Sequence, residues 1–347
     1  MMTLSSIIVV QTAFIGDAVL TLPMIQRIKN SYPDISIDVI TIPRTAEIFQ
    51  SHPAIRNVIV YDKRHTDRGI RGILSMVRIL KSKEYTAALI PHRSFRSALI
   101  PAIARIPLRI GFDKSAGAFL MTHVIPYRSD IHEIERNQTL LRDIGIPITG
   151  KELPSLYPST SDKEYITHIL TEWGIRSNSP FVAIAPGSVW ATKRWPADRY
   201  GQLIRMLNGK GVVSVLVGGN EDAALCREIV SRSDMVGTEC PSLVTAGRLT
   251  LLQSAALLQR ARVLVTNDTA PMHLAVAMRT PVIAIFGATV PAFGFSPYGE
   301  SDKVVETLGL PCRPCSIHGG QRCPIKKFDC MEKISTDRVF NEVLQKL

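Results

Sequence analysis

One carboxylate near the start of the sequence lies where a charged group is not expected. The apolar run IIVVQTAFIG, residues 7–16, leads directly into Asp17, and a second apolar run, AVLTLP, follows it. A carboxylate at the junction of a buried strand and a buried helix is costly unless it has a partner or a chemical role. Capping of the helix that follows would be one such role, because aspartate is a favoured N-cap residue. The alternative is a reaction in which the carboxylate takes part.

In the second half of the chain, small residues and cations follow an apolar run. The segment IAPGSVWATKRWP leaves its strand through Pro186, Gly187 and Ser188, and it places Lys193 and Arg194 just before a helix start. Small residues allow the backbone to approach a phosphate closely, and the cations neutralise it. The segment therefore predicts a phosphate site, and a solvent loop with incidental cations is the alternative.

Two further strand ends carry polar groups of the same kind. In VLVTNDTAPMHLAVAM, Asp268 or Thr269 caps the next helix, whose N-terminus is an anion site. His273, one turn into that helix, is either a buried histidine or a donor to a pyrophosphate. In VLVGGNEDAAL, Glu221 suits a ribose hydroxyl pair, although an acid at a helix N-terminus needs no ligand.

Several classes of function are disfavoured. No G-x-G-x-x-G follows a strand and no Walker A motif occurs, which argues against NAD-dependent and P-loop enzymes. The net charge is +11, and the segment Arg56–Arg109 holds 12 Lys or Arg against 3 Asp or Glu. We expect an anionic partner there, an acidic membrane surface or a phosphorylated acceptor, with a merely solvated surface as the alternative. Nucleic acid is not expected, because aromatic residues make up only 6% and no recognition motif occurs.

Four of the six cysteines cluster near the C-terminus in the pattern C-x2-C, seven residues, C-x6-C. Four thiolates with this spacing could bind zinc, although a second C-x2-C is missing, and reduced or partly buried thiols are the preferred interpretation. Disulfides are not expected in a cytoplasmic protein. The residues concerned are Cys312, Cys315, Cys323 and Cys330.

The elements that must position these groups alternate along the chain. Apolar runs such as SIIVVQ, ISIDVITI, FVAIAPG and VIAIFG are separated by amphipathic stretches, and they form two series. This pattern predicts an α/β protein of two Rossmann-like domains with parallel sheets that face a central cleft. Ligands of such sheets bind beyond the carboxyl ends of strands. No stretch reaches the roughly 18 apolar residues of a membrane span, and no cationic segment precedes the first apolar run, so we expect a cytoplasmic protein.

Domain boundaries follow from composition. We expect a first Rossmann-like domain over residues 1–160, a connection rich in Pro, Ser and charge over 161–178, and a second Rossmann-like domain over 179–330. A C-terminal helix over 331–347 is expected to pack back toward the N-terminal domain. The segment 69–83 reads as an amphipathic surface helix packed on the sheet, with direct membrane docking as the alternative.

Taken together, these pieces resemble the glycosyltransferase family that includes the ADP-heptose:lipopolysaccharide heptosyltransferases, inverting enzymes of the GT-B fold. The segment PHRSFRSALIPAIARIPLRIGF looks most like the members that add the second heptose of the inner core. The resemblance spans nearly the whole chain in the family's order, and it rests on the segments FIGDAVLTLP, APGSVWATKRWP, GGNED, NDTAPMHLAVAMRTPVIAIFGAT and PCRPC...RCPIKKFDCM.

The resemblance implies a role for each candidate residue. Asp17 would be the catalytic base, which takes the proton from the acceptor hydroxyl as it attacks. The domain over residues 1–160 would bind the acceptor, with His92, Arg93 and Arg96 facing it, and the domain over residues 179–330 would bind the nucleotide sugar. Residues around the donor would be Ser188 and Lys193 at the phosphates, Glu221 at the ribose, Leu249 near the adenine, and Asp268, Thr269 and His273 around the pyrophosphate and sugar. One position departs, because many members have Gly where this chain has Ala270.

The expected function is therefore transfer of heptose from ADP-heptose to a phosphorylated lipid A–core acceptor, at the inner face of the cytoplasmic membrane. No cofactor and no catalytic metal are expected, because Lys193 and helix N-termini supply the charge and no Asp-x-Asp motif occurs. A related transferase with another nucleotide-activated sugar and a non-catalytic nucleotide-sugar-binding protein are the alternatives.

Overall fold

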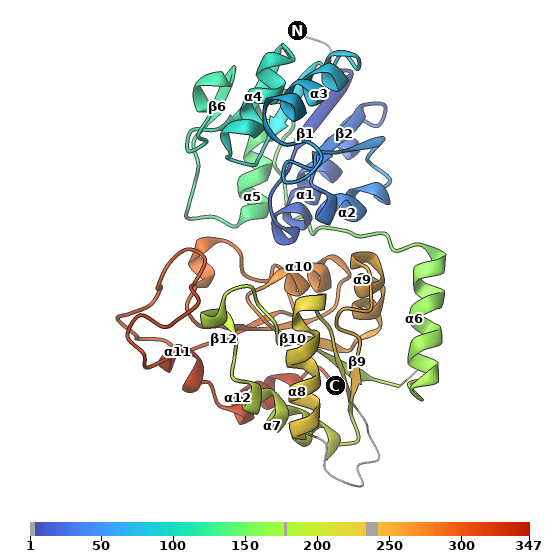
Figure 1. Cartoon of the computed structure of the whole chain (residues 1–347), viewed down its shortest axis with the longest axis vertical. Coiled ribbons are helices and arrows are strands. Elements are labelled where there is room, and N and C mark those ends of the chain that lie inside the picture. Colours follow the sequence, from blue (N-terminus) through green and yellow to red (C-terminus); the bar gives the residue numbers. More distant parts are fainter. Residues whose placement is uncertain (1–3, 177–178, 234–241) are drawn as a thin grey trace. The chain divides into compact units, whose positions relative to one another are not determined.

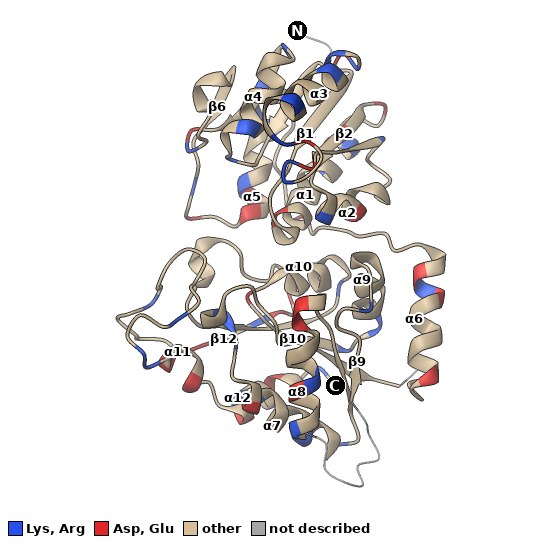
Figure 2. Ribbon diagram, viewed as in Figure 1, with Lys and Arg blue, Asp and Glu red and all other residues tan. Residues whose placement is uncertain are grey.

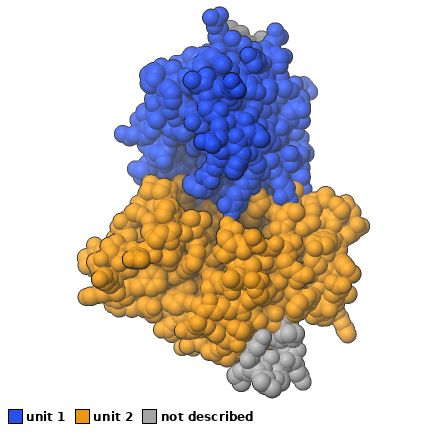
Figure 3. Space-filling view, in the orientation of Figure 1, with its two compact units in different colours: residues 1–157 blue, residues 158–347 orange. Residues whose placement is uncertain are grey.

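The computed structural model describes residues 4–176, 179–233 and 242–347. The chain forms two compact units, residues 1–157 and 158–347 (Figure 3). Each unit holds one six-stranded parallel sheet with helices packed around it (Figure 1). The expected α/β class with two Rossmann-like domains is confirmed.

The sheet of the first unit has the strand order β3-β2-β1-β4-β5-β6. Its central pair, β1 and β4, is in register with Ile7 opposite Ala87 and Val9 opposite Leu89. Its strands are β1 (Ser6–Val10), β2 (Ser36–Thr41), β3 (Asn57–Val60), β4 (Ala87–Ile90), β5 (Leu108–Phe112) and β6 (His123–Ile125). The helices are α1 (Ile15–Ser31), α2 (Ala46–Gln50), α3 (Gly69–Lys81), α4 (Phe95–Ile103) and α5 (Glu133–Gln138).

The sheet of the second unit repeats this order, read from the other edge, as β12-β11-β10-β7-β8-β9. Its central pair is β7 and β10, with Ile184 opposite Val265. The strands are β7 (Phe181–Ala185), β8 (Val213–Leu216), β9 (Leu243–Val244), β10 (Val263–Asn267), β11 (Val282–Phe286) and β12 (Lys303–Glu306). The helices are α6 (Thr160–Glu172), α7 (Ala197–Asn208), α8 (Ala223–Ser233), α9 (Leu251–Arg260), α10 (Ala270–Ala277), α11 (Asp329–Glu332) and α12 (Thr336–Leu344).

Burial explains why the central strands are apolar throughout. All residues of β1, β7, β10 and β11 are buried, as expected of a parallel sheet covered by helices on both faces. In α10 all residues from Met272 to Ala277 are buried, whereas amphipathic helices bury one stripe. In α3, for example, Met76, Val77 and Leu80 join the core, whereas Ile70 and Leu74 are 75% and 42% exposed.

The division into units differs from the expected boundaries in two places. Helix α6 lies within the second unit and packs against α9, so only a short segment around Tyr157 and Pro158 joins the units. The end of the expected connection, residues 177–178, lies outside the described residues. The C-terminal helix α12 belongs to the second unit, where it packs against α7 and adds Val339, Phe340 and Val343 to the core; its expected packing toward the first domain stays a prediction.

Among the described residues, no helix is long and apolar enough to span a membrane.

Candidate functional site

In both sheets the expected chemistry lies at the centre, where the strand order reverses direction. The chain leaves β1 toward Asp17 and leaves the neighbouring β4 toward His92 and Arg93. In the second unit it leaves β7 toward Lys193 and leaves the neighbouring β10 toward Asp268. Ligands of open α/β sheets bind at such switch points, beyond the carboxyl ends of the strands. We describe the two sites separately.

The second unit brings Lys193 and Asp268 together. The Lys193 Nζ atom lies 2.6 Å from Asp268 Oδ2, and both side chains are more than four-fifths buried. The same carboxylate oxygen accepts a hydrogen bond from the Thr289 hydroxyl at 2.7 Å. The ammonium group is therefore held at a defined place above the sheet by a carboxylate that is itself fixed, which suits contact with a phosphate.

Asn267, which precedes Asp268, fixes the exits of both central strands. It is fully buried, and its Oδ1 accepts hydrogen bonds from the Trp195 backbone N–H at 3.0 Å and from the Tyr200 hydroxyl at 3.1 Å. Its Nδ2 donates to the Pro186 carbonyl at 2.8 Å. One amide thus ties the loop that carries Lys193 to the strand that carries Asp268.

Ser188 lies in the loop after β7, which is closely packed. A Cβ atom at the neighbouring Gly187 would lie 2.0 Å from Asp222 Oδ1, so no other residue fits there without rearrangement. Ser188 is buried, its Oγ accepts the Trp190 N–H at 3.2 Å, and its carbonyl accepts two bonds from the Arg194 guanidinium, at 2.8 and 2.5 Å. Arg194 therefore holds the loop, whereas the sequence had suggested a second cation for phosphate.

The remaining expected donor residues lie at helix starts of the second unit. Thr269 precedes α10, and His273 is buried one turn into this helix. Ala270, the position that departs from the family pattern, is the first residue of α10 and is partly exposed. Leu249, half-buried, lies just before α9, whose cap is Thr250, and Glu221 is exposed after β8.

In the first unit, Asp17 lies in the first turn of α1 and is partly exposed. Its Oδ2 accepts the backbone N–H of Phe14 at 3.2 Å; Phe14 is the N-cap of α1 and Asp17 its N3 residue, whereas the sequence had suggested Asp17 as the N-cap itself. The helix start is further fixed by Thr21, whose hydroxyl donates to the Asp17 carbonyl at 2.8 Å. The carboxylate is therefore oriented by its own helix while part of it faces solvent.

Basic residues surround the ends of β1 and β4. His92 Nδ1 lies 2.9 Å from the Thr12 hydroxyl and 2.8 Å from the Ser97 hydroxyl, so the ring joins the two strand ends. Burial, with Lys63 and Arg93, lowers the pKa of His92 to about 4, and the ring is neutral at pH 7. Lys63 donates to the Thr12 carbonyl at 2.9 Å. Arg93 and Arg96 are exposed at the start of α4.

The ring of Tyr127 connects this region to α5. The guanidinium carbon of Arg93 lies 4.3 Å from the ring centroid, and that of Arg136 lies 4.4 Å from it. Cation–π contacts of this kind are stronger when the partners are desolvated, as Arg136 is, with no exposed surface. Arg136 also forms an ion pair with Glu133.

The cysteine cluster lies on the segment 311–330 of the second unit. Cys312, Cys315, Cys323 and Cys330 are free thiols, and over the described part of the chain no group of three His, Cys, Asp or Glu is placed to hold a metal ion. The segment packs against the loop that carries Lys193, because the Gly320 N–H donates to the hydroxyl of the neighbouring Thr192 at 2.7 Å.

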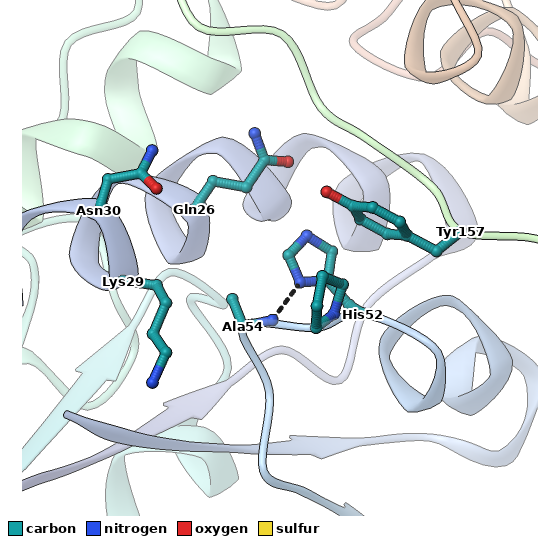
Figure 4. Close-up of a pocket in the computed structure, with 7 residues that line it drawn as sticks. Gln26, Lys29, Asn30, His52, Ala54 and Tyr157 are labelled. Atoms are coloured by element: carbon teal, nitrogen blue, oxygen red, sulfur yellow. Dashed lines mark hydrogen bonds between the residues drawn. The ribbon is translucent and has the colours of Figure 1, made fainter. Parts of the chain in front are cut away.

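A separate cavity of about 250 Å³ lies in the first unit, away from the ends of the central strands. Figure 4 shows the ring of His52, whose Nδ1 accepts the Ala54 N–H at 3.2 Å, beside the ring of Tyr157 at 5.0 Å. Lys29 lines the cavity but extends away from His52 in this view, and it donates to the Ile35 carbonyl at 3.0 Å. No set of groups converges there as at Lys193 and Asp268.

Sequence reasoning missed several residues that shape the two sites. Asn267 and Thr289 are polar residues at strand ends and could have been found by the same search that found Asp268. Glu133 and Arg136 carried no such signal, because they follow a long irregular segment and only the fold brings them near Asp17.

Comparison with known proteins agrees with this architecture. The model of "Glycosyltransferase family 9 (heptosyltransferase)" matches residues 73–324. The chain is 28% identical over 315 residues to lipopolysaccharide heptosyltransferase 2 of Escherichia coli K12, covering 87% of this chain and 88% of that protein. It is also 28% identical over 286 residues to lipopolysaccharide heptosyltransferase 3 of Escherichia coli, with 80% and 82% covered.

A solved structure has the same fold. The ADP-heptose lps heptosyltransferase II of E. coli superposes with a TM-score of 0.81 at 23% identity, over 98% of each chain. The fold is therefore GT-B, in which two Rossmann-like domains make up one glycosyltransferase. Because the family model matches well over half of the sequence, the chain belongs to glycosyltransferase family 9, the heptosyltransferases.

Proposed function

We propose that this glycosyltransferase moves heptose from ADP-heptose to the inner core of lipopolysaccharide, as the second heptose. The observation that carries the proposal is the 28% identity to a heptosyltransferase 2 over 87% of the chain, together with a buried Lys193–Asp268 pair at the switch point of the second sheet. The equal identity to a heptosyltransferase 3 leaves addition of a later heptose as the alternative.

In this mechanism the second unit holds the donor. Lys193 contacts the diphosphate, and its stabilising interaction becomes stronger as negative charge develops on the leaving group. Asp268 and Thr289 keep the ammonium in place, the N-terminus of α10 and His273 complete the anion site, and Ser188 lines it. Glu221 binds the ribose, and Leu249 contacts the adenine.

The first unit binds the acceptor and supplies the base. Asp17 takes the proton from the attacking hydroxyl, and Arg93 and Arg96 bind phosphate groups of the acceptor while His92 holds the strand ends together.

A second candidate function is a transferase that uses another nucleotide-activated sugar. Ala270, in place of glycine, favours it, because the methyl group of Ala270 narrows the space through which the diphosphate approaches the backbone.

The acceptor's lipid anchor implies work at a membrane surface, and the first unit has a suitable face. Phe119 and Ile70 are 78% and 75% exposed, and the ring of Phe95 lies 6.3 Å from that of Phe119. Figure 2 shows Lys and Arg along α3 and α4, the helices that carry Ile70 and Phe95. Exposed apolar groups among cations are typical of proteins that dock on anionic lipid.

The test of the function combines a donor screen with a turnover assay. ADP-heptose, GDP-sugars and UDP-sugars are offered with a lipid A–core acceptor that carries one heptose, and product is measured by mass spectrometry. We expect transfer from ADP-heptose alone. A ligand at 100 times its Kd stabilises the protein by about 2.7 kcal/mol, so a thermal-shift series should select the same nucleotide. Turnover with a different sugar would support the second candidate, and binding without turnover would identify a sensor.

A further inference from the structure

The first unit holds a second acidic side chain near Asp17 that the proposed mechanism does not use. Glu133 is the first residue of α5, is 8% exposed, and forms an ion pair with Arg136. Burial of a carboxylate costs free energy, and the ion pair with Arg136 offsets that cost only in part.

Glu133 and Asp17 lie on two helices that pack together. Helices α1 and α5 are side by side (Figure 1), and the Asn137 amide donates to the Leu20 carbonyl at 3.3 Å. One turn back along each helix from this bond leads to Glu133 and to Asp17. The two carboxylates are within electrostatic reach, since the charge of Asp17 raises the pKa of Glu133.

The charges around this pair are defined. Arg136, on the same helix, faces Glu133 and donates to the carbonyls of Arg128 and Ile131 at 2.5 and 2.7 Å. Arg93, after β4, lies over Tyr127, whose hydroxyl accepts from Arg136 at 2.9 Å. Both guanidinium groups lower the pKa of Glu133.

Burial outweighs these cations. It raises the pKa of Glu133 to about 7, with Asp17 adding to the rise and Arg136 opposing it. Near neutral pH, Glu133 therefore exchanges between its neutral and ionised forms, and its charge state is coupled to that of Asp17.

We propose that Glu133 is a positioning residue of the transfer reaction, which strengthens Asp17 as a base by placing a second negative charge beside it. The inference rests on the proposed function, in which Asp17 is the base. A neighbouring anion favours the protonated form of Asp17, so that Asp17 takes the hydroxyl proton more readily. Arg136 limits this effect, because it keeps Glu133 in place and partly balances its charge.

The coupling can be measured without activity. Carboxyl-¹³C NMR titration of the full-length protein should show one glutamate with a midpoint near 7. This signal should be absent in Glu133→Gln and present in Glu135→Gln, the control, which lies two residues further along the same helix. In Asp17→Asn the midpoint should fall by about one pH unit, because the coupling is reciprocal. An unchanged midpoint in Asp17→Asn overturns the inference, and this arm does not depend on how well Glu133→Gln folds.

The consequence for the reaction is read from the pH profile of kcat/KM. In the wild type kcat/KM should rise through about pH 7 as Glu133 ionises, and Glu133→Gln should lose this rise and be at most about tenfold slower above it, since a tenfold weaker base loses no more than that in rate. Glu135→Gln should do neither. A rise near pH 7 that persists in Glu133→Gln while Asp17→Asn is inactive overturns the role of Glu133 and leaves the proposed function intact. If the carboxylates are coupled but Asp17→Asn turns over normally, the base assignment fails, and the role of Glu133 fails with it.

Discussion

Asp17 makes the hydrogen bond of a helix cap and also lies at the strand end where a base is needed, so geometry alone is compatible with both roles. Asp17 is the N3 residue of α1, and the amide oxygen of an asparagine there can accept the same Phe14 N–H without being basic. We expect Asp17→Asn to lower turnover by about 10²- to 10⁴-fold, the usual range for loss of a general base. ADP affinity and melting temperature should stay near those of the wild type. Near-normal turnover, with loss only for residues that cannot cap, would instead assign Asp17 to structure.

The ammonium group of Lys193 is the second side chain whose role a single substitution can test. Its ammonium is held by Asp268 at 2.6 Å, and a leaving diphosphate would gain from this charge most strongly in the transition state. We expect Lys193→Ala to lower kcat/KM by about 10- to 1,000-fold, through both the donor KM and kcat, in steady-state kinetics. Lys210→Ala, an exposed lysine on the same unit, is the matched control. If Lys193→Ala and Lys210→Ala behave alike, the phosphates bind elsewhere.

At the scale of elements, the cations at the start of α4 should affect binding of only one of the two substrates, the acceptor. Arg93 and Arg96 are exposed there, in the first unit, whereas the proposed donor groups lie in the second. The double alanine variant should raise the acceptor KM and leave the ADP-sugar KM unchanged. Salt should weaken the wild type more than the variant, because exposed charges are screened over about 8 Å at physiological ionic strength. A loss confined to the donor KM would reverse the assignment of substrates to units.

The strands show how far sequence carries at this scale. The fully buried strands β1, β7, β10 and β11 were found as apolar runs, because burial on both faces leaves no polar position. Strand β5 was missed, and so were the outer strands β6, β9 and β12. These outer strands are shorter than β5, with two to four residues, and are partly exposed or interrupted by charge, and neighbouring strands alone decide their pairing.

The same reasoning applies to the sites. Strand ends predict Lys193, Asp268 and Asp17 as site residues, because the topology always gathers those positions. The partners of these groups depend on packing. The loop clamp by Arg194, the bond from Thr289 to Asp268, and the α5 helix beside α1 could not be predicted from spacing, since each joins residues that are distant in sequence or chemically ambiguous.

For the whole molecule, transfer should not need an added metal ion, because Lys193 and the helix N-terminus at α10 supply positive charge to the diphosphate. Initial rates in 5–10 mM EDTA, roughly the usual excess, should match those in buffer with magnesium. An absolute requirement for magnesium or manganese, restored by readdition, would contradict this mechanism.

Stability of the whole chain should depend on pH through His52. Burial lowers the pKa of His52 to about 4, whereas the unfolded chain binds this proton near 6.5. The stabilisation is thus complete above pH 6.5 and is lost as the pH falls toward 4, up to about 3 kcal/mol. Urea unfolding at pH 7.5 and 4.5 should show a smaller difference for His52→Gln than for the wild type. Equal differences in the two proteins would mean that His52 is protonated when folded.

Every strand of one sheet pairs only within its own half of the chain, and α6 belongs wholly to the second half. A recombination point between Tyr157 and Pro158 therefore leaves no strand without its neighbours. The two halves can be treated as exchangeable cassettes, so that a chimera with the first half of one family member and the second half of another should inherit its acceptor preference from one parent and its nucleotide preference from the other. Recombination at this point would diversify such enzymes while both sheets keep their strands.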